Sequence, residues 1–347
     1  MRMADRLPAP RHAREMTGTL PPDLAALVQR DEPVILRGYA ADWPLVRAGR
    51  ISGHAAADYL LRFDRGRPVT GYVGDAAIRG RFHYDETATA LNFKSQTLPL
   101  RDLLERLLDG ADGEGDAPAL YMGSTDLDAY LPGFRDENDL VPSDGLFARH
   151  PPLASIWIGN RTIASAHYDM ANNAAICAVG RRRFTLFPPD QIANLYPGPL
   201  TPTPGGQVVS MVDFARPDLD RYPRFGDAMA EAVVAELEPG DLLVYPALWW
   251  HHVETLEAFN ILVNYWWNTA PAYLDTPMDT VMHAMLSLRD RPAAEKRAWR
   301  GIFDHYVFGD PEAVVAHLPP ASHGPLAPLD EAMARRLRAY LLQRLNR

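Results

Sequence analysis

The stretch ASAHYDMANNAAICAVGRRRFTLFPPD, residues 164–190, decides the fold of this chain. A run of small and apolar residues in its centre predicts a buried strand, and a second β-rich run at 183–187 stops at a pair of prolines. His167 and Asp169 lie two positions apart, and on a strand this spacing points both side chains to the same face. An imidazole nitrogen and a carboxylate oxygen on one face can bind a divalent metal together.

A third ligand is expected from LLVYPALWWHHVETL, residues 242–256. In this segment His251 and His252 follow a hydrophobic run that ends in two tryptophans. Neighbouring residues on a strand face opposite sides, so the pattern alone leaves both histidines open. Two histidines and one carboxylate form the facial triad of non-heme Fe(II) oxygenases, in which the remaining positions receive cosubstrate and dioxygen.

The chain also contains a second HYD triplet, which serves as an internal control. His83 and Asp85 lie in the polar, arginine-rich stretch RGRFHYDETA, and no long buried strand is predicted after them. We therefore interpret this second pair as surface residues rather than metal ligands.

Four ordered blocks give a resemblance to a known family. They are HYD, GRRRFTLFPPDQIANLYPGPL, PGDLLVYPALWWHHVE and NILVNYWWN. Together they resemble the cupin-like branch of the JmjC oxygenases, with most similarity to factor-inhibiting HIF asparaginyl hydroxylase and its bacterial relatives. The segment EPVILRGYAADWP, residues 32–44, resembles the opening segment of the same family. The resemblance implies that the third ligand is the histidine directly after the paired aromatics, which is His251.

The same resemblance implies a site for the cosubstrate 2-oxoglutarate. Family members use a basic residue fifteen positions after the first ligand, which is Arg182 here, where most relatives carry lysine. The chain has only two lysines among 35 basic residues, so a general preference for arginine over lysine is one explanation for the arginine at position 182. A guanidinium is nevertheless longer, planar and bidentate. Relatives place a hydroxyl residue three positions before the first ligand, but this chain has Ala164, which removes one hydrogen bond to the cosubstrate. Matching by position also implies that four further residues lie near 2-oxoglutarate: Tyr121, Asn173, Asn264 and Trp266.

Composition limits the classes of partner and compartment. The chain is 47% hydrophobic and 23% charged, as is usual for a globular protein. Its formal net charge is −9 with both signs intermixed, which disfavours a nucleic acid partner. The single cysteine, Cys177, lies in an apolar run and is expected to be buried, and the lack of a disulfide framework fits a reducing compartment. No signal peptide or membrane-spanning run of about 18 to 20 apolar residues is evident, so we expect a cytoplasmic protein.

The order of elements predicts a mainly β fold with flanking helices. Short strands separated by Pro and Gly from Ala119 to Asn268 suit a double-stranded β-helix barrel of the cupin or jelly-roll type. Helices are expected over residues 20–30, 51–63 and 98–108. The Pro- and Gly-rich segment 196–225 is long enough to form part of a substrate wall.

Residues 1–270 are predicted to form a catalytic domain and residues 271–347 a C-terminal helical region. Apolar stripes in that region need a partner surface, either the barrel or a second chain. They comprise Met278, Val281, Met282 and Met285, and then Met333, Leu337, Tyr340, Leu341 and Leu345. Because relatives dimerise through helices of this kind, the resemblance implies a homodimer.

The predicted function is that of an Fe(II)- and 2-oxoglutarate-dependent oxygenase, a hydroxylase of a protein side chain or a small molecule. His167, Asp169 and His251 would bind the iron and Arg182 would bind the far carboxylate of 2-oxoglutarate. Two alternatives belong to other classes. One is a metal-binding cupin without 2-oxoglutarate dependence, which Ala164 and Arg182 favour. The other is a non-catalytic binding or scaffold protein.

Overall fold

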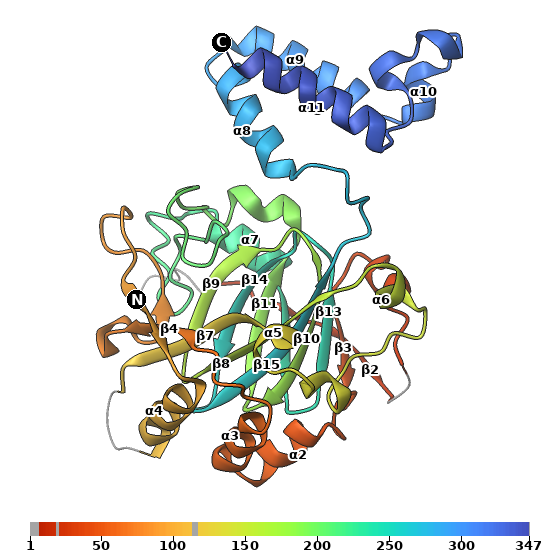
Figure 1. Cartoon of the computed structure of the whole chain (residues 1–347). Coiled ribbons are helices and arrows are strands. Elements are labelled where there is room, and N and C mark those ends of the chain that lie inside the picture. The colour runs from red at the N-terminus through yellow and green to blue at the C-terminus, as the bar shows by residue number, and fades with distance from the viewer. Residues whose placement is uncertain (1–6, 19–20, 113–116, 347) are drawn as a thin grey trace. The chain divides into compact units, whose positions relative to one another are not determined.

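A computed structural model describes residues 7–18, 21–112 and 117–346 of the chain (Figure 1). The chain divides into two compact units between Asn268 and Thr269. The first unit holds all the described strands and the second is helical. The assignment of catalysis to the first part and dimerisation to the second stays a prediction.

Two sheets build the first unit. The larger sheet has nine strands in the order β2 (Arg14–Thr17), β3 (Val34–Arg37), β13 (Leu242–Tyr245), β10 (Asn172–Val179), β15 (Asn260–Trp267), β8 (Leu153–Gly159), β7 (Ala119–Asp126), β4 (Val69–Gly74) and β6 (Phe93–Leu98). The smaller has six strands in the order β1 (Arg11–His12), β12 (Val233–Leu237), β11 (Arg182–Phe187), β14 (Trp250–Thr255), β9 (Ile163–Tyr168) and β5 (Arg81–Phe82). Strands β8 to β15 pair in antiparallel fashion, and the predicted cupin or jelly-roll class is confirmed.

Alternation along each strand decides what faces the space between the sheets. On β15, Ile261, Val263, Tyr265 and Trp267 pack into the core beneath the larger sheet, whereas Leu262 packs between the two sheets. Asn264 lies on the same side of β15 as Leu262. Cys177 on β10 is fully buried in the core between the sheets, as expected for a small hydrophobe. Polar side chains on this inner side are therefore enclosed by apolar layers.

Alternation also separates two neighbouring arginines on β11. Arg182 is 2% exposed and points inward. Arg183 lies on the outer side, where it pairs with Glu236 at 2.7 Å and Glu254 at 3.9 Å on the flanking strands. Those two glutamates are its direct cross-strand neighbours in register. One arginine thus has two charged partners, whereas the other enters the interior.

The α-helices of the first unit cover parts of both sheets. They are α1 (Leu24–Val28), α2 (Pro44–Ile51), α3 (Gly53–Leu61), α4 (Leu100–Asp112), α5 (Leu127–Tyr130), α6 (Leu146–Arg149) and α7 (Phe225–Glu231). The last of them, α7, packs against β11 of the smaller sheet. Helices α2, α3 and α4 pack on the face of the larger sheet that points away from the smaller one (Figure 1). The single helix predicted over 51–63 is wrong at its start: Ser52 is extended, ends α2 and caps α3 by accepting a hydrogen bond from Ala55 N at 3.0 Å.

Among the described residues, the second unit has four α-helices and two 3-10 turns, Pro320–Ser322 and Gly324–Leu326. The α-helices are α8 (Pro277–Leu288), α9 (Ala293–Tyr306), α10 (Pro311–Val315) and α11 (Glu331–Leu345). The apolar stripe predicted on α8 is only partly covered within the unit, since Val281 and Met282 remain 46% and 51% exposed. In the parts of the chain that the structure describes, no helix has the length and apolar character needed to cross a membrane.

Candidate metal centre

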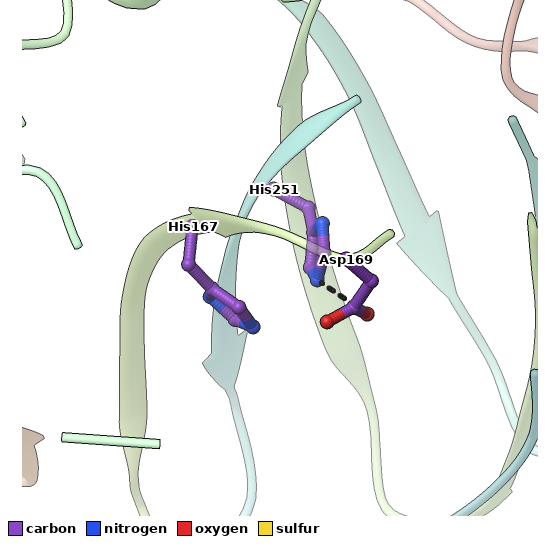
Figure 2. Close-up of side chains that lie close together, drawn as sticks. All are labelled: His167, Asp169 and His251. Atoms are coloured by element: carbon purple, nitrogen blue, oxygen red, sulfur yellow. Dashed lines mark ion pairs between the residues drawn. The ribbon is translucent and has the colours of Figure 1, made fainter. Parts of the chain in front are cut away.

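The three predicted ligands meet at one end of the smaller sheet. His167 on β9 and His251 on β14 are direct cross-strand partners, and their ring centroids lie 4.3 Å apart. Asp169 follows β9 and places its Oδ2 3.5 Å from Nε2 of His251 (Figure 2). One donor atom from each residue lies within 4.8 Å of the others, which is compatible with a single ion between them.

Backbone carbonyls fix the orientation of both imidazoles. Nδ1 of His167 lies 2.9 Å from the carbonyl oxygen of Ser165, and Nδ1 of His251 lies 3.0 Å from that of Trp249. Because a carbonyl oxygen can only accept, each Nδ1 carries a proton and donates it, which leaves each Nε2 as the ring nitrogen available to a metal. Burial is the main cause that lowers the pKa of His251 to about 4, so this ring is neutral at pH 7. A neutral imidazole with a free Nε2 is the form that binds metal.

Three donors hold Asp169 in place. Nδ2 of Asn173 and Nε1 of Trp266 each donate to Oδ2 of Asp169 at 3.0 Å. The backbone amide of Leu248 donates to the Asp169 carbonyl at 2.8 Å and so joins the two ligand segments. Leu248 adopts a left-handed φ of 66°, which is uncommon for a leucine and makes the turn before the paired tryptophans. The Asp169 carboxylate is thus oriented before any metal binds.

Neighbouring histidines occupy other environments. His252 turns to the opposite side of β14, where its ring stacks on Phe214 at 4.2 Å. His83 is buried and its Nε2 donates to the Ser210 carbonyl at 3.0 Å, while Asp85 accepts bonds within its own turn. The interpretation of the second HYD as a surface pair is therefore wrong for His83, although neither residue belongs to the metal-ligand cluster.

A chain of hydrogen bonds runs from the strand β8 to Asp169. Nε1 of Trp157 donates to Oδ1 of Asn264 at 2.6 Å, and Nδ2 of Asn264 lies 3.5 Å from Oδ1 of Asn173. Asn173 then donates to Asp169. Since an indole can only donate, it sets the orientation of both amides along this path. Sequence reasoning did not single out Trp157, because a tryptophan on an alternating strand is usually a core residue.

Arg182 is buried without hydrogen-bond partners for two of its nitrogens. Nε and Nη2 are fully enclosed and bond to no described atom. Burial lowers the pKa of Arg182, yet a guanidinium stays charged near neutral pH. Tyr121 lies close enough to Arg182 for their charges to interact. Burial is the main cause that raises the pKa of Tyr121, the charge of Arg182 opposes this shift, and the charge of Asp169 adds to it. An unpaired cation in the interior is costly, so this site is suited to an anion.

A cavity of about 820 Å³ opens beside His167. Its wall includes Ala164, Tyr121 and Trp157 together with residues 203–207, which belong to the segment predicted as a substrate wall. Volumes of this order are typical of small-molecule sites. Two sequence-predicted residues, Tyr121 and Ala164, therefore face the same space as His167.

The fold and the ligand geometry define a cupin-like protein. The sequence pattern of the family described as "Cupin-like domain" matches residues 22–273, and the chain belongs to this family. The most specific part of the prediction, similarity to an asparaginyl hydroxylase, stays a prediction.

The individual proteins that the chain resembles share between 26% and 34% sequence identity with it. The chain is similar to the Homo sapiens protein HSPB1-associated protein 1, with 26% identity over 247 residues, covering 69% of this chain and 48% of that protein. A Danio rerio homolog is 34% identical over 153 residues, covering 44% of this chain and 30% of the relative. The Mus musculus tRNA wybutosine-synthesizing protein 5 is 29% identical over 210 residues, covering 54% of this chain and 60% of that protein. The chain thus spans about half the length of the human relative.

Proposed function

We propose that the chain is an Fe(II)- and 2-oxoglutarate-dependent oxygenase that hydroxylates a protein side chain or a small molecule. The observation that carries the proposal is the convergence of His167, Asp169 and His251 beside a cavity, with the unpaired cation of Arg182 in the same interior. Two imidazoles and one carboxylate are the donor set expected for non-heme Fe(II).

Each residue fits the group that it would hold. Both histidines use Nδ1 for a backbone carbonyl and direct Nε2 elsewhere, and among the described residues Asn173 and Trp266 donate to Oδ2 of Asp169 rather than to Oδ1. The unpartnered nitrogens of Arg182 are suited to the distal carboxylate of 2-oxoglutarate, for which a guanidinium offers a bidentate contact. Bound Fe(II) and 2-oxoglutarate would supply oxidative chemistry, in which dioxygen is consumed and the cosubstrate is decarboxylated to succinate.

The surrounding residues would control access to that chemistry. Trp157 stacks on Tyr121 at 5.9 Å and meets Trp266 edge to face at 5.7 Å. This aromatic wall would exclude water from the reacting atoms. Ala164 leaves the cosubstrate with one fewer hydrogen-bond donor than in relatives, so Arg182 and Tyr121 would contribute more of its binding.

Turnover of 2-oxoglutarate to succinate with added Fe(II), measured without a target substrate, tests the proposal. Asp169→Ala should abolish succinate formation and weaken binding of the metal, because one of three ligands is lost. Asp85→Ala, in the second HYD triplet, is the matched control and should leave both unchanged. A variant Asp169→Ala with full turnover would exclude the proposed triad.

The alternatives predict other results. A cupin without 2-oxoglutarate dependence would bind metal but form no succinate, and a scaffold protein would do neither. Arg182→Lys distinguishes a functional arginine from a defective one: a large gain in 2-oxoglutarate affinity would mean that the native guanidinium is poorly matched. The name of one relative refers to tRNA, but a net charge of −9 favours a protein side chain or small molecule as substrate here.

A further inference from the structure

Strand β9 carries a β-bulge directly before the metal ligand His167. Its pairing with β14 shifts register between His251 and Val253, so that one residue on β14 opposes two on β9, Ser165 and Ala166. A bulge interrupts the ladder of backbone hydrogen bonds and turns the side chains beside it in a new direction. Contacts from outside the strand pair are therefore needed to hold the bulge and, with it, the orientation of His167.

Two hydrogen bonds from other segments hold the bulge. Nε of Arg81 donates to the hydroxyl of Ser165 at 3.2 Å, and the backbone amide of Ser210 donates to the Ala166 carbonyl at 2.7 Å. The carbonyl of Ser165 in turn accepts a hydrogen bond from Nδ1 of His167 at 2.9 Å. Ser165 thus connects Arg81, through its side chain, to a metal ligand, through its backbone.

A hairpin-like loop, residues 196–212, carries part of the cavity wall. The amide of Gly198 donates to the Val209 carbonyl at 2.9 Å and closes the base of this loop. Residues 203–207, at its tip, line the cavity beside His167. We call this loop the wall hairpin, and the position of its base sets where the tip stands at the cavity.

Arg81 also holds the base of the wall hairpin. Its Nη2 donates to the Val212 carbonyl at 3.0 Å and to the Met211 carbonyl at 3.4 Å. Burial is the main cause that lowers the pKa of Arg81, yet a guanidinium stays charged near neutral pH and keeps all its donors. Because these donors form a planar fork of fixed geometry, bonds to both partners set the position of the hairpin base relative to Ser165.

We propose that Arg81 is a positioning residue that couples the wall hairpin to the metal ligand His167 through the hydroxyl of Ser165. Such a coupling is reciprocal: metal binding that fixes His167 also steadies the hairpin, and a substrate that steadies the hairpin strengthens metal binding. The inference rests on the proposed function for the role of the cavity as a substrate site, but the coupling itself can be measured with a metal alone.

Mn(II) affinity of the full chain, measured by competition with a chelator, tests the path through Ser165. Arg81→Met and Ser165→Ala should each weaken Mn(II) binding about 3- to 30-fold, the range for changes along a coupling path. The double variant should bind no more weakly than Arg81→Met alone, because both changes break the same hydrogen bond. Arg79→Met is the matched control: Arg79 is exposed, pairs with Asp213 at 4.0 Å beside the hairpin, and should leave the affinity unchanged.

Hydrogen exchange followed by mass spectrometry tests the coupling in the other direction. Saturating Mn(II) should slow exchange in wild-type peptides that cover the wall hairpin, because the Ser210 amide is bonded to the bulge that the metal steadies. Arg81→Met should lose this slowing at its own saturating Mn(II), and Arg79→Met should keep it. A purely structural role of Arg81 would instead speed exchange by the same factor with and without metal.

Three results would overturn the proposal. They are unchanged Mn(II) affinity in Arg81→Met or Ser165→Ala, additive losses in the double variant, or an equal effect of Mn(II) on hairpin exchange in the wild type and Arg81→Met. Should Arg81→Met not fold, Ser165→Ala decides alone, since it breaks the same bond with a smaller change and must show both effects. An intact coupling without 2-oxoglutarate turnover would count against the proposed oxygenase function only.

Discussion

Replacement of Arg182 by methionine should stabilise the protein and at the same time abolish its response to 2-oxoglutarate. Two guanidinium nitrogens of Arg182 are buried without a partner. A buried unsatisfied polar group costs about 1 to 3 kcal/mol, and more when it is charged. Methionine fills a similar volume without a charge, so Arg182→Met should raise the free energy of unfolding by about 1 to 4 kcal/mol when no cosubstrate is present.

Cosubstrate should reverse much of this difference. With Mn(II) present, 2-oxoglutarate at one hundred times its Kd should stabilise the wild type by about 2.7 kcal/mol. The Arg182→Met variant should gain little, because the cation that binds the distal carboxylate is gone. Urea unfolding, with and without 2-oxoglutarate, measures both effects, and Mn(II) alone serves as the reference.

The neighbouring Arg183→Met is the matched control. Arg183 is partly exposed and pairs with Glu236 on the outer face, so its loss should change stability by about 0.5 kcal/mol or less and leave the 2-oxoglutarate response intact. The reasoning would be refuted if Arg182→Met were less stable than the wild type without cosubstrate. It would also be refuted if 2-oxoglutarate stabilised both proteins equally.

Three further predictions concern the metal, pH and assembly. Asn173→Ala or Trp266→Phe should weaken metal affinity about 10- to 100-fold in a chelator competition, because Asp169 loses a donor that orients it; unchanged affinity would contradict this. Burial lowers the pKa of His83 to about 4, so the folded state binds fewer protons than the unfolded state between that pH and about 6.5. Stability should therefore fall as pH drops through this window, by about 1 to 3 kcal/mol for this residue, and His83→Gln should make the fall measured by urea unfolding shallower. The full chain should be a dimer by light scattering, and Met282→Glu with Leu286→Glu, at positions 51% and 79% exposed, should yield a folded monomer; a monomeric wild type would exclude this assembly.

Local patterns predicted much of the fold and the centre of the site. The HxD spacing predicted that His167 and Asp169 lie close together on one side, and their donor atoms lie within 4.8 Å of each other at the end of β9. The inward turn of Arg182 beside the outward turn of Arg183 follows from the same alternation. In each case neighbours in the sequence determine which way a side chain points.

Other features depend on contacts between distant segments. The pattern alone left His251 and His252 open, because their faces are fixed by the register of β14 against β9. The cavity wall combines β6 and β8 with residues 203–207, so no single segment predicts it. The sequence did not predict the helix boundary at Ser52. A serine can stand at the cap of a helix or inside it, and only the extended backbone of Ser52 identifies it as a cap.

The hydrogen-bonded path from Trp157 through Asn264 and Asn173 has a practical consequence for redesign. A wall residue of the cavity and a carboxylate of the candidate metal centre belong to one polarised array. Replacing Trp157 to enlarge the cavity would remove the donor that orients Asn264 and Asn173. The Asp169 carboxylate would then be held less firmly in its present orientation. Attempts to broaden substrate range should therefore begin at Phe93 or Leu91, which line the cavity outside this array.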